Sequence, residues 1–169
     1  MNRSLLDDAF AHHSWASLKL IDACLALTEE QLATSVPGTY GSILDTARHL
    51  VGADVWYLHR MSDQRWPTVD EDSMSLPELH AAQEVNAARW VELLSAGPDP
   101  DTMVNVRWED GSETRAPFGI RLAQALHHGT DHRSQVCTAL TTLGIEPPNI
   151  DVWAYGEAVG RVVEVPPTA

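Results

Sequence analysis

The sequence predicts an all-α fold, a four-helix bundle with a small β-hairpin before the fourth long helix. Four segments repeat apolar residues every three or four positions, which is the spacing of one buried helix face. Few segments show the alternation of apolar and polar residues that is typical of strands. Because 169 residues can bury a sizeable core, we expect a single domain over residues 1–169.

The first two helices are predicted in the first third of the chain. Apolar residues step by four and three over residues 5–27, which is the pattern of a helix in a bundle. Pro37 and Gly38 interrupt the chain, and the same pattern returns over residues 43–61. His49 borders the apolar face of this second helix, so we expect its imidazole near the inside of the bundle.

The third helix and the hairpin are predicted in the middle of the chain. Ser75 and Glu78 have the spacing of a capping box, which marks the start of a helix. Residues 97–98, a Gly-Pro pair, end this helix. Apolar and polar residues then alternate over residues 104–108, and an Asp-Gly pair at 110–111 follows. This pattern predicts a short hairpin.

The fourth helix is predicted over residues 118–143, with Gly144 as its C-terminal cap. His128 and His132 lie beside its apolar stripe. A further short helix fits within residues 151–163.

The charge of the chain argues against several classes of partner. The sequence has 24 acidic and 11 basic residues, which gives a net charge of −13. Binding to phosphate groups draws on clustered Lys and Arg, so we expect no nucleic acid and no membrane partner. No apolar stretch approaches the ~20 residues of a membrane span, and no signal-peptide core is visible, which favours the cytoplasm. Cys24 and Cys137 lie among apolar helical positions, where a thiol usually behaves as a small hydrophobic group.

Three histidines form a candidate metal site. His128 and His132 are four residues apart, so their imidazoles share one helix face, one turn apart. His49 on a neighbouring helix would complete a set of three neutral nitrogen ligands. Such a set leaves coordination positions for water or substrate. A pair with this spacing also arises by chance among eight histidines, but positions beside apolar faces favour a metal site, since unpaired buried polar groups are costly.

Other interpretations exist for residues around this site. In the peptidase motif H-E-x-x-H a glutamate follows the first histidine, whereas Gly129 occupies that position here. The reversed motif H-x-x-E-H fits with Asp131 in place of glutamate, although a solvated or supporting carboxylate is the simpler role for Asp131. His13 lies on the apolar face of the first helix. It fits a hydrogen-bonded core histidine, a hydrogen-bond partner of a ligand, or a fourth ligand.

The chain resembles the DinB superfamily of DinB/YfiT-like metalloenzymes. The resemblance rests on His49 within RHLVGAD, on HHGTDHRSQV and on LGIEPPNIDVWAY. Its most specific part is the pattern H-x-x-x-H-R-x-Q, which is formed here by His128, His132, Arg133 and Gln135. It implies a DinB-like four-helix bundle that holds one divalent ion on His49, His128 and His132. Zinc or nickel is the expected metal, with iron or manganese as alternatives.

The resemblance also implies a class of function and of partner. Related proteins act as thiol S-transferases or thiol-dependent isomerases, with a low-molecular-weight thiol as cofactor and a small-molecule electrophile as substrate. A metal-bound thiol is deprotonated, which makes it a nucleophile. A homodimer is expected from the family. Two alternatives remain open: a metal-dependent hydrolase that uses metal-bound hydroxide, and a non-catalytic metal-binding or stress-response bundle. Ser134 and Asp131 depart from the residues that many members carry, which affects the shape of the substrate site more than the ligands.

Basic and aromatic residues near the site have two interpretations each. A cationic patch for the carboxylates of a thiol would draw on three arginines, for each of which a structural role is the simpler interpretation: Arg48, Arg121 and Arg133. Three tryptophans fit either the mouth of the site or the core, and the core is the commoner place for large aromatic side chains: Trp56, Trp90 and Trp108.

Overall fold

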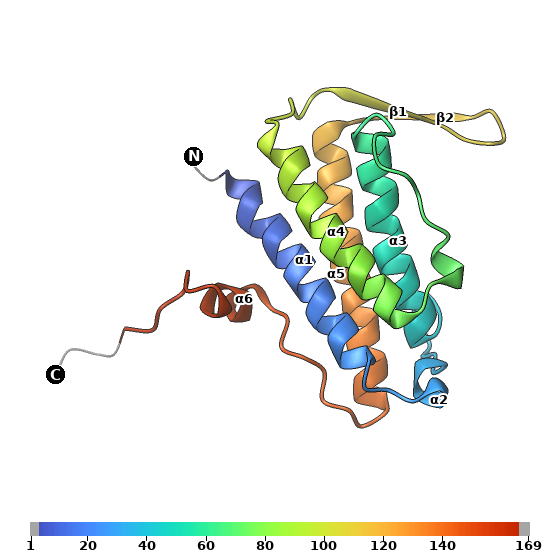
Figure 1. The fold of residues 1–169 in the computed structure, drawn as a ribbon, viewed down its shortest axis with the longest axis vertical. Coiled ribbons are helices and arrows are strands. Elements are labelled where there is room, and N and C mark those ends of the chain that lie inside the picture. The colour runs from blue at the N-terminus through green and yellow to red at the C-terminus, as the bar shows by residue number, and fades with distance from the viewer. Residues whose placement is uncertain (1–3, 166–169) are drawn as a thin grey trace.

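The computed structural model describes residues 4–165, and this part of the chain is mostly helical with one small two-stranded sheet (Figure 1). The helical class and the hairpin predicted from the sequence are therefore confirmed. The four long helices are α1 (Leu5–Cys24), α3 (Ile43–Met61), α4 (Leu76–Ser95) and α5 (Phe118–Thr142). The short elements are α2 (Glu29–Leu32), the 3-10 helix η1 (Glu71–Ser73), α6 (Val152–Ala158), and the strands β1 (Met103–Arg107) and β2 (Glu113–Pro117).

Each long helix packs mainly against two others, in the cyclic order α1, α4, α3, α5, and α1 also touches α3 across the middle. α3 and α4 run in the same direction, because the connection between them returns along the molecule past η1 (Figure 1). α1 and α5 run in the opposite direction (Figure 1). α3 and α5 are therefore antiparallel neighbours, and this arrangement brings His49 beside the histidines of α5. Within the described residues, no helix has the length and apolar character needed to cross a bilayer.

The starts of the helices follow from local sequence. Ser4, Ser42 and Ser75 precede α1, α3 and α4, and the backbone N–H of each donates to a carboxylate three residues later. α5 begins differently, since the connection before β1 supplies its first acceptors. Phe118 N–H donates to Thr102 O at 2.8 Å, and Gly119 N–H donates to Pro100 O at 2.9 Å. The base of the hairpin is thereby fixed to the start of α5.

The hairpin pairs β1 with β2 in antiparallel register, with Asn105 opposite Arg115. Gly111 has φ +84°, a left-handed conformation that glycine adopts without strain, as the predicted Asp-Gly turn requires. The hairpin crosses the end of the molecule where α3 ends and α5 begins (Figure 1). Two segments that showed no helical period in the sequence, α2 and η1, are too short to display one.

The core consists of two apolar clusters separated along the helices by a polar layer. One cluster, which includes Leu20, Leu50 and Leu140, lies at the α2 end of the long helices, and the other, which includes Phe10 and Trp90, lies at the hairpin end. Between them, every long helix contributes buried polar side chains: His13 and Ser17 from α1, Asp54 from α3, Gln83 and Asn86 from α4, and His132 and Arg133 from α5. The polar layer contains the candidate site.

Candidate metal centre

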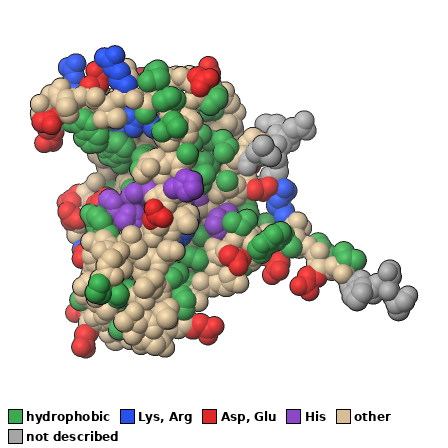
Figure 2. Space-filling view, turned by 180° about the vertical axis from the view of Figure 1, so that it is seen from behind, with side chains coloured by type: hydrophobic (Ala, Val, Ile, Leu, Met, Phe, Trp, Pro, Cys, Tyr) green, Lys and Arg blue, Asp and Glu red, His purple; other side chains and the backbone are tan. Residues whose placement is uncertain are grey.

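The structure brings together all three histidines that the sequence singled out. His49 comes from α3, and His128 and His132 come from successive turns of α5. One candidate ligand atom from each lies within 4.8 Å of the others. Figure 2 shows histidine side chains grouped near the middle of the rear face of the molecule. We call these three residues the histidine cluster.

The spacing inside the histidine cluster suits a shared ion. Nε2 of His49 and Nε2 of His128 are 3.1 Å apart. Metal–nitrogen bonds of about 2.0–2.1 Å, at angles between octahedral and tetrahedral values, separate two ligand nitrogens by about 2.8–3.4 Å. The Nε2 atoms of His49 and His128 thus have the separation of two ligands of one ion, and with His132 within 4.8 Å the cluster is compatible with a metal-binding protein.

The Nδ1 atoms of His49 and His132 each have a hydrogen-bond acceptor, and this acceptor fixes the tautomer of the ring. Nδ1–H of His49 donates to Oε1 of Glu71 at 3.2 Å, and Nδ1–H of His132 donates to Oε1 of Gln135 at 3.2 Å. Carboxylate and amide oxygens can only accept, so these Nδ1 atoms carry the protons and the Nε2 atoms carry lone pairs. The same Gln135 oxygen accepts the backbone N–H of Tyr40 at 2.8 Å. This is the arrangement that orients metal-binding histidines in proteins.

Gly52 makes room for the carboxylate of Glu71. Glu71 lies in η1, which packs against α3. A Cβ atom at position 52 would overlap the Glu71 carboxylate. The sequence showed Glu71 only as part of an acidic stretch and Gly52 only as a glycine within a helix, so neither carried a signal for this contact.

Tyr40 covers the histidine cluster from the loop before α3. Its ring stacks on His49 with centroids 4.1 Å apart and an interplanar angle of 4°, and it meets His132 edge-on at 5.5 Å. Tyr57 meets His128 edge-on at 5.9 Å on another side of the cluster. Sequence reasoning did not find Tyr40, because nothing in a loop residue's neighbours indicates which helix it will contact.

Burial keeps two of the candidate ligands neutral. Burial, with smaller contributions from the other two histidines, lowers the pKa of His128 to about 4. Burial and the neighbouring His49 also lower the pKa of His132. Because an imidazole must be unprotonated to bind a metal, both rings are available as ligands at neutral pH without first losing a proton.

His13 belongs to a different group, which we call the buried network: His13, Asp54, Gln83, Asn86 and Arg133. Nη1 of Arg133 donates to Nδ1 of His13 at 3.1 Å, and Nε2–H of His13 donates to Asp54 at 2.9–3.0 Å. Both ring nitrogens are thus used within the protein, which argues against the alternative of a fourth ligand. The structure supports the alternative of a hydrogen-bonded core histidine.

The buried network balances one positive and one negative charge. Burial lowers the pKa of Arg133 to about 10, which still leaves the guanidinium charged at neutral pH. Burial raises the pKa of Asp54, but its interactions with His13 and Gln83 outweigh this effect, so the pKa lies below its usual value. Gly129 allows the close packing, since a Cβ there would overlap the ring of His13.

The arginines considered for a cationic patch have structural partners. Arg133 is 3% exposed and is held within the buried network. Nη2 of Arg121 donates to Val104 O at 3.0 Å beneath the hairpin, and Nε of Arg48 donates to Met74 O at 2.9 Å. Asp131, considered as a general base, is exposed to solvent.

A cavity of about 360 Å³ opens beside the histidine cluster, and we call it the site cavity. It is lined by His49, Gly52, Ala53, Trp56, Tyr57, Glu71, Trp108 and His128. Trp90 fills the core, as expected, with 1% of its side chain exposed. Trp56 packs against the apolar cluster at the hairpin end and also lines this cavity. For Trp108, which is 44% exposed and lines the cavity, the structure favours the other interpretation, a place at the mouth of the site.

The protein is thus a mostly helical protein with a candidate metal site, in which two antiparallel helices bring three imidazoles together. The sequence matches the model of the DinB family over residues 1–161, so the chain belongs to the DinB family. The resemblance drawn from the sequence is confirmed. The comparison with curated proteins gives no match.

Proposed function

We propose that this chain is a divalent-metal-dependent enzyme of the thiol S-transferase or thiol-dependent isomerase type, with His49, His128 and His132 as metal ligands. The four long helices form a DinB-type four-helix bundle and a single domain in this proposal. The observation that carries it is the convergence of three imidazoles, two of them 3.1 Å apart, with Nδ1 atoms of His49 and His132 held by Glu71 and Gln135. Zinc or nickel is the proposed ion.

The donor set suits activation of a thiol. Three neutral imidazoles leave the charge of a divalent ion uncompensated, and such an ion lowers the pKa of a bound thiol far enough to deprotonate it. Around the ion, Glu71 and Gln135 hold the ligand rings in place, and Tyr40 covers one side of them. The site cavity leaves room for a small-molecule electrophile next to His49 and His128.

The thiol in this proposal comes from outside the chain. Burial raises the pKa of Cys24 to about 12, and burial also raises the pKa of Cys137. Both thiols are therefore protonated at neutral pH, and a protonated thiol is a poor nucleophile. Neither cysteine lies among the residues that line the site cavity. A low-molecular-weight thiol supplied from solution fits these facts.

Metal analysis is the first test. Untagged protein, purified without chelator, is expected to hold about one zinc or nickel per chain, and His49→Ala is expected to hold none. His127→Ala is the matched control, because His127 is an exposed neighbour of His128 on the same helix. A wild-type protein that is free of metal and gains no thermal stability from any divalent ion would contradict the proposal.

Thiol consumption is the second test. Metal-loaded protein is expected to accelerate the loss of a low-molecular-weight thiol to an added electrophile, and His49→Ala is expected to lose this activity. Consumption that continues unchanged in His49→Ala would refute the assignment. Turnover of esters or amides without any thiol would instead favour a hydrolase.

A further inference from the structure

We propose that Trp56 and Trp108 form a selective wall of the site cavity, and that this wall binds a flat aromatic group on the electrophilic substrate. This inference deepens the proposed function and rests on it for the identity of the site. The wall and the histidine cluster border one cavity, so a molecule held by the first lies within reach of the second.

The sequence of α3 places the wall at a fixed distance from the histidine cluster. His49 and Trp56 are seven residues apart, which puts them two turns apart on one helix face. Between them, Ala53 lines the cavity with a small side chain, and the Glu71 carboxylate lies against Gly52. A substrate lying along this face would extend from the histidines at one end to the indole at the other.

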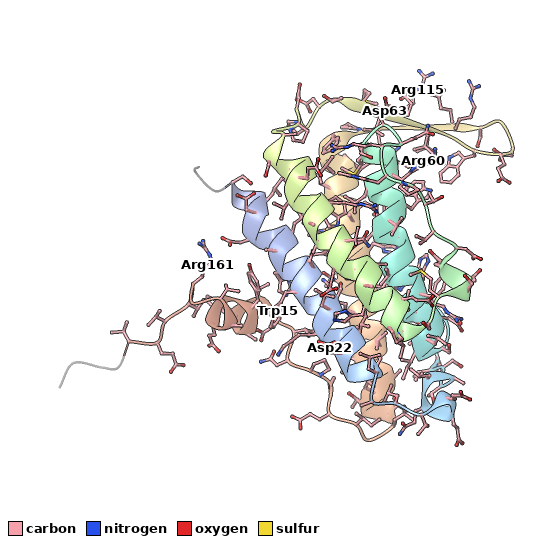
Figure 3. All side chains as sticks on the ribbon, viewed as in Figure 1. Trp15, Asp22, Arg60, Asp63, Arg115 and Arg161 are labelled. Carbon is pink, nitrogen blue, oxygen red and sulfur yellow. The ribbon has the colours of Figure 1, made fainter. Side chains whose placement is uncertain are left out.

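Trp108 extends the wall from the hairpin. Its ring is nearly parallel to that of Trp56, with an interplanar angle of 14° and centroids 5.8 Å apart. This offset arrangement makes one broad apolar surface from two rings. Arg60 lies 5.6 Å from the Trp56 ring and belongs to the hairpin end of α3, as Figure 3 shows. The guanidinium lies over the ring, where a cation–π interaction helps to hold the indole in place.

Trp108 is held in place although it is exposed. Nε1–H of Trp108 donates to Oγ1 of Thr114 at 2.8 Å across the hairpin. The side chain nevertheless stays 44% exposed. Stacking on Trp56 and this hydrogen bond hold the ring at the edge of the site cavity with part of its surface open. A flat ligand that covers the open part would bury further apolar surface, which favours binding.

The size of the site cavity limits the group that it can hold. Its volume of about 360 Å³ lies at the small end of ligand pockets. The group that fits beside the two indole rings is therefore small and flat.

Saturated imides test the proposal, because they cannot accept a thiol and so report binding without turnover. The metal-loaded full chain is titrated with N-phenylsuccinimide and N-cyclohexylsuccinimide, which are of similar size but differ in flatness. We expect the phenyl compound to bind about fivefold more tightly, as measured by ligand-observed NMR.

Substitutions at the wall assign the preference to Trp108. Trp108→Leu keeps an apolar residue in the hairpin and is expected to abolish the preference for the phenyl compound, whereas Trp108→Phe is expected to keep most of it. Trp153→Ala is the matched control, since Trp153 is 71% exposed and does not line the cavity. Equal binding of the two imides to wild type, or a preference that survives in Trp108→Leu, would overturn the proposal.

The metal content of each variant separates this inference from the proposed function. Wall variants are expected to retain the ion. A chain that binds no metal but prefers the phenyl compound through Trp108 would refute the proposed function and leave the aromatic wall intact. A chain that consumes thiol but shows no preference would refute the wall alone.

Discussion

The histidine cluster and the buried network lie in the same polar layer, yet their imidazoles differ in the use of the ring nitrogens. In the buried network, His13 donates from one nitrogen and accepts at the other, both within the protein. In the histidine cluster, His49 and His132 have acceptors for Nδ1, and Nε2 of His49 lies 3.1 Å from Nε2 of His128 inside the cluster. A histidine with two protein partners holds the fold together, and a histidine with one partner keeps a lone pair for a ligand.

The largest expected effect is on stability, and it comes from the buried network. Asp54→Ala removes the carboxylate that balances the buried Arg133 and leaves N–H donors of His13 and Gln83 without acceptors. We expect the free energy of unfolding to fall by about 3–5 kcal/mol, as measured by urea denaturation. Asp131→Ala removes an exposed carboxylate and should change it by less than about 0.5 kcal/mol. Equal stability of both variants would contradict the structural role of the network.

Substitution of a proposed metal ligand should affect metal binding rather than stability. The variant should lose the ion and keep the fold. His132→Ala removes one of three proposed ligands but leaves both apolar clusters intact. We expect metal affinity to fall by more than ~100-fold, since loss of a mere supporting contact already costs 10–100-fold. Helical circular dichroism should persist. An unfolded variant would show that the histidine cluster is needed for the fold and would remove the distinction between the two groups.

Removal of the Glu71 carboxylate, which supports His49, should lower metal affinity by an intermediate amount. Glu71→Ala leaves Nδ1 of His49 without its acceptor, so the ring is less well oriented. Metal affinity should fall about 10–100-fold in a metal titration. Asp70→Ala is the control, because Asp70 is an exposed acidic neighbour. Similar losses in the two variants would indicate a general effect of negative charge.

A smaller effect is expected on how the stability of the metal-free protein changes with pH. The pKa of His128 is about 4 in the folded chain and 6.5 without the influence of the fold. Between these values the unfolded chain binds more protons, so stability is lost as the pH falls from 6.5 towards 4. The melting temperature should fall less steeply over this range in His128→Gln than in wild type. His127→Gln, at an exposed position, is the control, and an unchanged slope in His128→Gln would contradict the assignment.

The parts of the molecule that the sequence predicted are those that depend on local periodicity. The helical class, the hairpin with its Asp-Gly turn, and the pairing of His128 with His132 follow from spacings of a few residues. His49 could be joined to that pair only through its place beside an apolar face and the resemblance to the DinB family. The match of the family model confirms that resemblance.

The parts that the sequence did not predict depend on contacts between distant segments. Tyr40 reaches Gln135 across 95 residues, and His13 reaches Asp54 across 41. No local pattern indicates such pairs. His13 had the right position for burial, but its partners could not be read from its own helix. The wall position of Trp108 likewise depends on where the hairpin folds over α3, and the hairpin pattern alone does not determine this.

Two adjacent residues of α5 serve the two histidine groups. His132 and Arg133 point about 100° apart around the helix axis, so one faces the histidine cluster and the other the buried network. The same buried hydrogen bonds that tie α5 to α1 therefore also set where the pair of His128 and His132 lies relative to His49. In the proposed function, the three imidazoles lie together before an ion binds. Such a site would be preorganised, in contrast to small zinc domains whose sites assemble only as the metal binds.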